Sequence, residues 1–295
     1  MPSTATSELR RAVGRVGVWL FGRAMEADAP AIGRRIEGLG YPTLWVGGGN
    51  TNPAALARLD EVLRGSERLI VATGITSIWA WEPAELARRA GELAAGNGRF
   101  VLGLGVSHQP LVEHLGRRYE RPYSAMAAYL DELDAAGGDV PVVLAALGDK
   151  MLTLSRDRSA GAHPYFTPVE HTARARRVLG AEPLLAPELA VVLDEDPVTA
   201  RATARAYAER YLALPNYAQN LLRLGYSADD LAGGGSDRLV DAVIAWGSAA
   251  AIAERVRAHL DAGADHVCIQ PLAPDGEMDF DALGELAPLL LGAGR

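Results

Sequence analysis

The sequence predicts an α/β fold, a (β/α)8 barrel with a helical excursion between its seventh and eighth strands. The first observation is that short apolar runs, suited to strands buried on both faces, alternate with amphipathic helical stretches. The second is that eight such runs occur, which favours a barrel over an open doubly wound sheet. The third is the length of 295 residues, over which α/β barrels commonly form one domain.

The first half of the chain predicts strands and helices in strict alternation. Residues 1–14 are polar and charged, and we expect a flexible tail there, followed by one domain over residues 15–295. Pro53 and Pro83 occupy the first turns of two predicted helices, where proline is favoured. The predicted strands are 15–21, 43–46, 69–73 and a run from residue 100, and the predicted helices are 29–39, 53–63 and 83–95.

The second half continues the alternation and then departs from it. Between the seventh and eighth predicted strands lie more than seventy residues that predict only helices, without the sustained Pro/Ser/Gly linker that would mark a second domain. The predicted strands of this half are 142–145, 161–165, 189–193 and 266–270. The predicted helices are 123–136, 151–158 and 169–179, then 196–214, 216–224, 237–246 and 249–262 in the excursion, and 280–291 at the end.

Composition argues against several classes of protein. With 49% hydrophobic and 22% charged residues, the chain can bury a large core and is not disordered. The net charge of -8 argues against a nucleic-acid partner, and no apolar run approaches the roughly 20 residues that span a bilayer. The single cysteine, Cys268, has apolar neighbours and is expected to be a buried thiol in a cytoplasmic protein.

Residues 99–108 form the first candidate site. Gly103 and Gly105 punctuate a buried strand, and His108 follows where that strand leaves the core, at the end where α/β folds bind ligands. Residues 103–108 begin like the Gly-x-Gly-x-x-Gly fingerprint of dinucleotide-binding proteins, but His108 stands where the third glycine belongs. We therefore favour glycines that let a ligand approach the backbone closely over a Rossmann site. His108 and His114 do not share a helical face, and no metal site is predicted.

Residues 146–151, between a strand and a helix, form the second candidate site. Gly148 frees backbone N–H groups that can cradle a phosphate, while an ordinary turn capped by Asp149 is an equal alternative. Lys150 is the only lysine, and contact with phosphate or solvent is favoured because nothing nearby would depress its pKa for Schiff-base chemistry. Trp79 lines a pocket or packs as a lid, and both interpretations stay open.

Several of these segments together resemble a known family. The segments are Leu44-Trp45-Val46-Gly47, Thr73-Gly74-Ile75-Thr76, residues 99–107, and residues 146–151 followed by 159–165. On them the chain resembles the luciferase-like monooxygenase superfamily, and within it the F420-dependent oxidoreductases of actinobacterial type, over nearly all of residues 14–291. The resemblance implies a TIM barrel with an insertion, a flavin or deazaflavin at the carboxyl ends of the strands, and often a homodimer.

The resemblance also implies roles for single residues. It places a cis peptide at Gly74–Ile75, against the cofactor ring, and the phosphate at the turn around Gly148. Relatives often have an acidic residue or histidine where residues 47–50 are Gly-Gly-Gly-Asn, and a proline where Asp149 stands. The cofactor-binding residues are expected to be Gly47, Gly48, Thr73, Gly74, Ile75, Gly105, Val106, Ser107, Leu147, Gly148, Asp149, Lys150 and Met151. The substrate pocket is expected to contain Trp19, Trp79, His163 and Tyr165.

This resemblance predicts an oxidoreductase that binds F420 and transfers a hydride between the deazaflavin C5 and a small organic substrate. His108 is the expected acid/base residue, because an unperturbed histidine titrates at about pH 6.5; a hydrogen bond to the following loop alone is the alternative. Three other functions stay open: an FMN-dependent monooxygenase with a flavin reductase as partner, a cofactor-binding homologue without catalysis, and an aldolase-like barrel that uses Lys150. No metal, nucleic-acid or membrane partner is expected.

Overall fold

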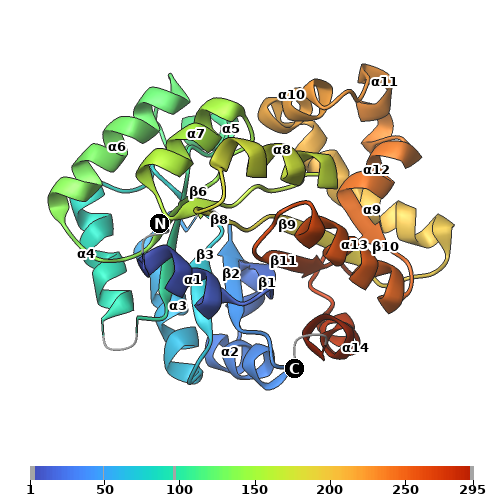
Figure 1. The fold of residues 1–295 in the computed structure, drawn as a ribbon, viewed down its shortest axis with the longest axis horizontal. Helices are drawn as coiled ribbons and strands as arrows, with labels where there is room; N and C mark the ends of the chain where they lie inside the picture. The colour runs from blue at the N-terminus through green and yellow to red at the C-terminus, as the bar shows by residue number, and fades with distance from the viewer. Residues whose placement is uncertain (1–3, 49, 96–97, 293–295) are drawn as a thin grey trace.

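Parallel strands form one sheet in the computed structural model, which describes residues 4–48, 50–95 and 98–292 (Figure 1). The order of neighbours is β10-β9-β11-β1-β2-β3-β5-β6-β7-β8, with β4 paired to β5, and every pairing is parallel. The prediction of an α/β fold with a parallel sheet is confirmed. The strands are β1 (Val16–Phe21), β2 (Thr43–Gly47), β3 (Ile70–Thr73), β4 (Thr76–Ser77), β5 (Phe100–Gly105), β6 (Val142–Leu144), β7 (Gly161–Ala162), β8 (Leu184–Leu185), β9 (Glu188–Val192), β10 (Ile244–Trp246) and β11 (Val267–Pro271).

The sheet curls, because strands β8 and β9, which lie far apart in the strand order, are joined by one short segment of chain. β8 lies at one end of the strand order and β9 near the other, yet only Ala186 and Pro187 separate them in the chain. The Ala186 N–H donates to Ala162 of β7 at 2.9 Å, and Pro187 C=O accepts from Cys268 of β11 at 2.9 Å. The carboxyl ends of the parallel strands therefore meet around one opening.

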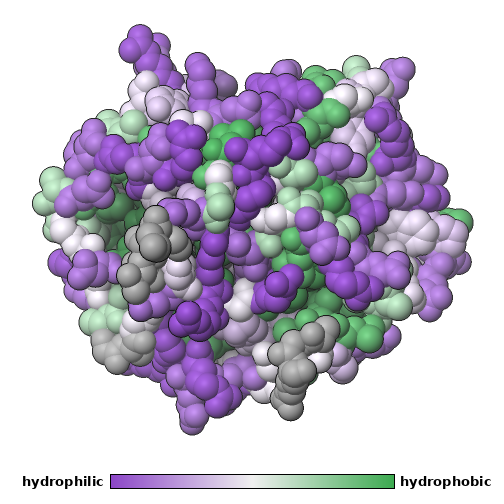
Figure 2. Space-filling view, in the orientation of Figure 1, coloured by the Kyte–Doolittle hydropathy of each residue, from purple (hydrophilic) through white to green (hydrophobic). Residues whose placement is uncertain are grey.

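Helices surround this sheet, with α4 and α6 on one side of the view in Figure 1 and α9, α12 and α13 on the other. Several begin at side-chain caps: Asn52 Oδ1 accepts from the backbone of Ala55 at 3.0 Å just before Pro53. Figure 2 shows that most of the outer face in this view is hydrophilic, with smaller apolar patches between. The helices are α1 (Thr4–Val13), α2 (Ala29–Gly38), α3 (Pro53–Gly65), α4 (Pro83–Ala94), α5 (Gln109–His114), α6 (Pro122–Ala136), α7 (Asp149–Arg158), α8 (Val169–Leu179), α9 (Pro197–Leu212), α10 (Pro215–Arg223), α11 (Ala228–Leu231), α12 (Asp237–Val243), α13 (Ala249–Asp261) and α14 (Phe280–Leu291), with 3-10 turns Gly22–Met25 and Ala232–Gly234. None of the helices in the described segments is long and apolar enough to cross a membrane.

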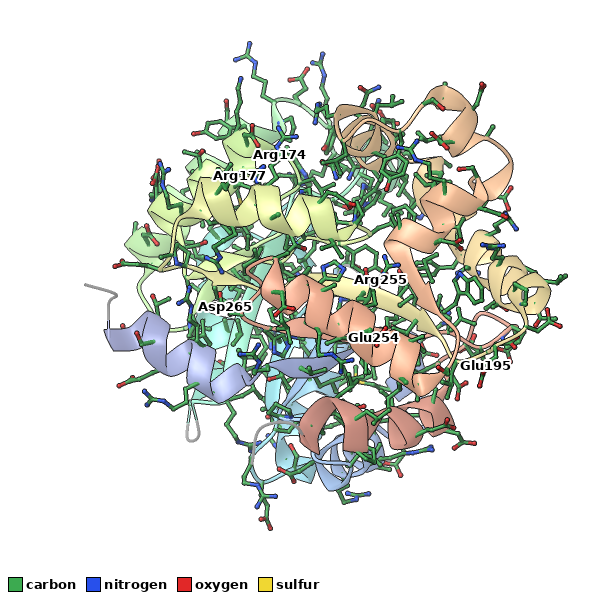
Figure 3. All side chains as sticks on the ribbon, turned by 45° about the vertical axis from the view of Figure 1, so that its right-hand side comes forward. Arg174, Arg177, Glu195, Glu254, Arg255 and Asp265 are labelled. Atoms are coloured by element: carbon green, nitrogen blue, oxygen red, sulfur yellow. The ribbon has the colours of Figure 1, made fainter. Side chains whose placement is uncertain are left out.

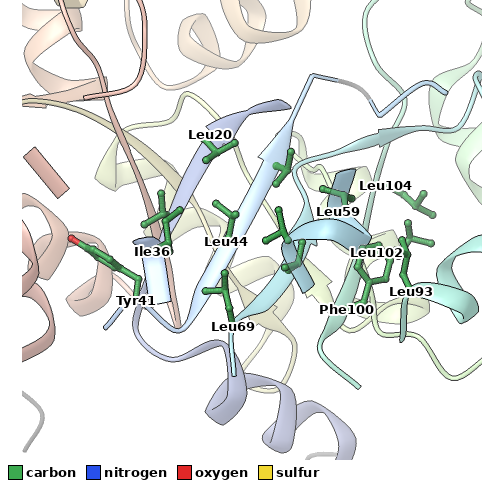
Figure 4. Packing of buried hydrophobic residues seen from close by; sticks show 14 of the residues in the cluster. Leu20, Ile36, Tyr41, Leu44, Leu59, Leu69, Leu93, Phe100, Leu102 and Leu104 are labelled. Atoms are coloured by element: carbon green, nitrogen blue, oxygen red, sulfur yellow. The ribbon is translucent and has the colours of Figure 1, made fainter. Parts of the chain in front are cut away.

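The longer strands supply two cores, because successive side chains point to opposite faces. Leu20, Leu44 and Phe100 are among the residues that pack between the sheet and its outer helices (Figure 4). Trp19 and Trp45, next to them in the chain, belong instead to the cluster inside the curled sheet. Strands buried on both sides explain why the sequence shows continuous apolar runs rather than alternation.

The expected flexible tail over residues 1–14 is corrected by the structure, which has helix α1 there. Leu9 and Val13 are buried in the cluster inside the curled sheet. Thr43 Oγ1 also donates to Val13 C=O at 2.7 Å, which fastens the end of α1 to the start of β2. Leu9 and Val13 stand among polar residues in the sequence, so the sequence pattern did not distinguish this helix from a tail.

The predicted helical excursion also needs correction. The helix expected over residues 237–246 ends at Val243, and Ile244–Trp246 form strand β10 beside β9, with Ile244 opposite Ala190. An apolar run as short as this fits a helix end or a buried strand equally well, and the free edge of β9 decides between them. The strand expected over residues 161–165 is only Gly161–Ala162, because Pro164 has no N–H for a further rung.

Candidate functional site

A cavity of about 430 Å³ opens at the carboxyl ends of the central strands. This volume is within the range of small-molecule and cofactor sites. Segments that follow β3, β5, β6 and β7 form the wall of this cavity. Helix α10 closes one side of it. The lining residues are Ile75, Val106, Ser107, His108, Tyr119, Pro122, Ala145, Ala146, Leu147, Gly148, Met151, His163, Tyr165, Pro215, Asn216, Tyr217, Gln219 and Arg223.

The segment after β3 brings Ile75 into the cavity. The Gly74–Ile75 peptide is cis, as the resemblance implied. Asn50 Nδ2 donates to Ile75 C=O at 3.2 Å and to Val46 C=O at 2.9 Å, so the loop after β2 holds this segment in place. A Cβ at Gly105 would lie 2.7 Å from Ile75 Cδ1, which explains the glycine in β5.

His108 lines the cavity just before α5, as the position after the fourth predicted strand suggested. Its Nδ1 lies 3.0 Å from Asn216 Oδ1, and its ring is 5.3 Å from the ring of Tyr217, centre to centre. Burial lowers the pKa of His108 from its usual value, while the bond to Asn216 acts in the opposite direction. Because an amide oxygen only accepts, Nδ1 carries the hydrogen of the neutral ring, and Nε2 is left as a proton acceptor.

The turn at Leu147 and Gly148 presents the start of α7 to the cavity. Gly148 is the N-terminal cap residue of α7 and has no side chain to satisfy the first backbone N–H groups of that helix. His171 Nε2 lies 2.8 Å from Leu147 C=O and holds the turn from behind. Arg223 faces it from α10, with Nη1 3.8 Å from the position that a Cβ at Gly148 would take. Open N–H groups and a guanidinium together favour an anion.

Asp149 and Lys150 follow this turn but are exposed, and neither is among the lining residues of the cavity. Asp149 forms a two-pronged ion pair with Arg174, at 2.9 and 2.8 Å. Arg174 projects from α8 (Figure 3), and its hydrogen bond lowers the pKa of Asp149. The carboxylate charge that departs from the family pattern is therefore offset by Arg174 rather than by Lys150.

His163 is a buried, neutral histidine at the cavity wall. Its Nδ1 lies 2.6 Å from Ala186 C=O, so Nδ1 donates, and burial lowers its pKa to about 4. The neutral ring stacks on Trp45, with ring centres 4.3 Å apart. Nε2 is buried and has no hydrogen-bond partner among the described residues. This nitrogen lies 3.3 Å from the position that a Cβ at Gly74 would take.

A cluster of tyrosine hydroxyl groups lies behind the cavity wall. The Tyr165 hydroxyl is 2.7 Å from that of Tyr207 and 2.8 Å from that of Tyr211. Gln270 Oε1 accepts from Tyr165 at 2.9 Å or from Tyr207 at 3.1 Å, and Tyr207 also reaches Glu188 Oε1 at 3.3 Å. Since each hydroxyl has one hydrogen, these contacts are alternatives, and the protons of the cluster can rearrange among them.

The structure thus brings together part of the predicted site. Thr73 is fully buried and bonds to Gly103, which links β3 to β5, and Trp79 Nε1 donates to Val106 C=O at 2.8 Å. Trp19 packs against Gly47 and Gly74 beneath the cavity, where a Cβ on Gly47 would overlap its ring. The predicted residues that line the cavity are Ile75, Val106, Ser107, His108, Leu147, Gly148, Met151, His163 and Tyr165. Those placed elsewhere are Trp19, Gly47, Gly48, Thr73, Gly74, Trp79, Gly105, Asp149 and Lys150; Gly49 lies outside the described residues.

Sequence reasoning missed the residues that α10 contributes. Asn216, Tyr217 and Arg223 lie in the excursion, more than forty positions after the last predicted site residue, Tyr165. Their only signal was the amphipathic pattern of a helix with aromatic and cationic side chains. The described residues contain no group of three or more His, Cys, Asp or Glu side chains that could hold a metal ion.

Comparisons with known proteins agree with this geometry. Residues 15–136 match the sequence profile of the luciferase-like monooxygenase family. A 5,10-methylenetetrahydromethanopterin reductase of Methanolobus tindarius is 24% identical over 203 residues, 57% of this chain. The match spans 62% of that relative's length.

Solved structures share the fold over nearly the whole chain. The coenzyme F420-dependent tetrahydromethanopterin reductase of Methanopyrus kandleri has a TM-score of 0.79 at 14% identity, over 96% of this chain and 100% of its own. An F420-dependent secondary alcohol dehydrogenase in complex with an F420–acetone adduct has a TM-score of 0.72 at 14% identity, over 96% and 99%. The FMN complex of the oxygenating constituent of 3,6-diketocamphane monooxygenase from Pseudomonas putida has a TM-score of 0.68 at 16% identity, over 94% and 99%.

These relatives are two reductases, a dehydrogenase and a monooxygenase. Of the three solved structures, two are of F420-dependent enzymes and one contains FMN. The resemblance predicted from the sequence is confirmed: residues 15–136 match the luciferase-like monooxygenase family, and the relatives named above are similar to the chain in sequence or fold.

Proposed function

We propose that this chain is an oxidoreductase that binds F420 in the cavity and transfers a hydride between the deazaflavin C5 and a small organic substrate. The observation that supports it most is the wall formed by Gly148 and Arg223, an anion site at one end of a largely apolar cavity. Part of this proposal is that residues 15–295 form one domain with a (β/α)8 barrel. In this barrel β8 and β9, over residues 184–192, together take the place of the seventh strand predicted over residues 189–193.

The residues present fit a phosphate-bearing cofactor. Gly148 leaves the start of α7 open, and Arg223 adds a positive charge opposite. Val106, Ser107 and His163 line the same cavity. When bound, F420 would supply or accept the hydride, and the protein would supply orientation and proton transfer.

His108 is the residue that we assign to proton transfer. Its Nδ1 is engaged with Asn216, which fixes the ring and leaves Nε2 to take a proton from a substrate hydroxyl or to return one. Because burial lowers its pKa, the ring is neutral at pH 7 and ready to accept a proton. Alcohol oxidation and carbonyl reduction are the two directions of the same exchange.

Cofactor titration tests the proposal. Purified protein is titrated with F420 and, separately, with FMN, and the dissociation constants are measured by fluorescence. We expect tighter binding of F420, since its oligoglutamate tail carries anions beyond the phosphate, and a loss of about tenfold or more in Arg223→Ala. Lys150→Ala is the matched control, because Lys150 is exposed and outside the cavity lining. Equal losses in the two variants, or no binding of either cofactor, would contradict the assignment.

An FMN-dependent monooxygenase is the second candidate. The diketocamphane monooxygenase that shares the fold contains FMN, and a cavity with one anion site meets the need of its single phosphate. In that case a flavin reductase would supply reduced FMN. A homodimer is a further part of the proposal, carried over from the resemblance. Tighter binding of FMN than of F420 in the same titration would favour this candidate.

A further inference from the structure

We propose that Gln219 on α10 is a specificity residue, which forms hydrogen bonds with the hydroxyl groups of the chain that joins the cofactor ring to its phosphate. This inference rests on the function proposed above, because F420 and FMN both carry a hydroxylated ribityl chain between ring and phosphate. It adds a polar middle to the cavity, between the anion site at Gly148 and the proton-transfer residue His108.

Three polar side chains lie in one row on α10. Asn216, Gln219 and Arg223 all line the cavity. Because an α-helix turns by about 100° per residue, positions i, i+3 and i+7 fall within an arc of about 60° on its surface. The buried face of the helix carries other residues, Tyr217, Asn220 and Leu221. The cavity therefore meets a polar face of α10 that runs along the helix.

Contacts with the rest of the cavity wall fix the two ends of this row. At the first end, Asn216 Oδ1 lies 3.0 Å from Nδ1 of His108. At the other end, Arg223 Nη1 lies 3.8 Å from the position that a Cβ at Gly148 would take. A helix rises about 1.5 Å per residue, so the row extends about 10 Å from the proton-transfer end to the anion end. A ligand that uses both ends must bridge this length and pass Gln219.

Gln219 has a carboxamide that the protein leaves available to a ligand. The side chain is exposed and forms no hydrogen bond with any residue that the structure describes. Its two N–H donors and its oxygen acceptor suit hydroxyl groups, since a hydroxyl both donates and accepts. Being uncharged, it does not compete with Arg223 for a phosphate. Ala145, Leu147 and Met151, which line the cavity from the end of β6 to α7, have apolar side chains and provide no such partner.

Two synthetic ligands test this role on the full chain. Both carry the F420 ring and one phosphate, but one has the ribityl chain and the other a pentyl chain without hydroxyl groups. Dissociation constants are measured by fluorescence for the wild type and for Gln219→Met, Arg223→Ala and Gln109→Met. Methionine resembles glutamine in length and helix propensity, so α10 should keep its shape. Gln109→Met is the matched control, because Gln109 is exposed, bonds to Glu113 and is not among the lining residues of the cavity.

We expect Gln219→Met to bind the ribityl ligand about 2- to 12-fold more weakly than the wild type does, as for the loss of one hydrogen bond between neutral groups, and to bind the pentyl ligand equally well. Arg223→Ala should weaken both ligands by the same factor, and Gln109→Met should weaken neither.

A loss in Gln219→Met that is equal for the two ligands, or no loss for the ribityl ligand, would overturn the role of Gln219. Gln219→Ala should show the same difference between the ligands, and it replaces Gln219→Met if methionine disturbs the fold. Binding of neither ligand by the folded wild type would overturn the function proposed above, so the two failures are distinguishable.

Discussion

Replacing Glu188 by glutamine should change how the stability of this protein depends on pH. Glutamine keeps the shape and can still accept from the Phe166 N–H, but it cannot ionise. In the folded wild type the pKa of Glu188 is about 8, against 4.5 for an exposed glutamate. Between these two values the folded chain holds a proton that the unfolded chain has released.

The sign and the size of the effect follow from this difference. Because the folded state binds more protons in this range, the contribution of Glu188 is fully present below pH 4.5 and is lost as the pH rises through about 8. The difference between about 8 and 4.5 corresponds to about 5 kcal/mol of unfolding free energy, or about 1.4 kcal/mol for each pH unit. Glu188→Gln should not show this loss.

Urea unfolding of the two proteins, followed by tryptophan fluorescence at one-unit steps from pH 5 to pH 9, measures the effect. Buried histidines such as His163 and His259 titrate in both proteins, so their contribution cancels in the difference. We expect the unfolding free energy of Glu188→Gln, relative to that of the wild type, to increase as the pH rises. Parallel stability profiles would refute the inference that Glu188 is a neutral acid in the folded protein.

Three other predictions follow from the same geometry. His108→Ala should reduce turnover by about 10²–10⁴-fold with little change in cofactor affinity, measured by steady-state kinetics and titration; turnover within a few-fold of wild type would remove its proton-transfer role. Gly105→Ala should destabilise the fold by about 1–3 kcal/mol in urea unfolding, because its Cβ would lie 2.7 Å from the Ile75 side chain. Gly38→Ala is the control: its Cβ would meet nothing within 4 Å, so this variant should be neutral or stabilising in the same assay. Acidification should destabilise the wild type as the pH falls from 6.5 through about 4, since the pKa values of His163 and His266 are lowered to about 4 by burial; a thermal midpoint unchanged over that range would contradict it.

Part of the candidate site was predictable because it depends on topology alone. In a sheet of parallel strands, residues that follow different strands meet at one edge, however far apart they are in sequence. This is why His108 after β5, Gly148 after β6 and His163 after β7 could be expected together from the strand pattern and the resemblance. Proline and asparagine at helix starts, as at Pro53 and Asn52, likewise act locally and can be recognised in the sequence.

The sequence by itself determined most of the order of strands and helices, since hydrophobic periodicity and caps involve residues close along the chain; helix α1 and strand β10 are exceptions. Only the tertiary structure decided which side chains of the excursion return to the cavity, because helix α10 is placed by packing against distant elements and not by its own pattern. Arg223 therefore takes the place beside Gly148 that Lys150 was expected to fill. The proton state of Glu188 was decided in the same way: a carboxyl is neutral or charged according to its burial and its partners, and both come from the folded chain.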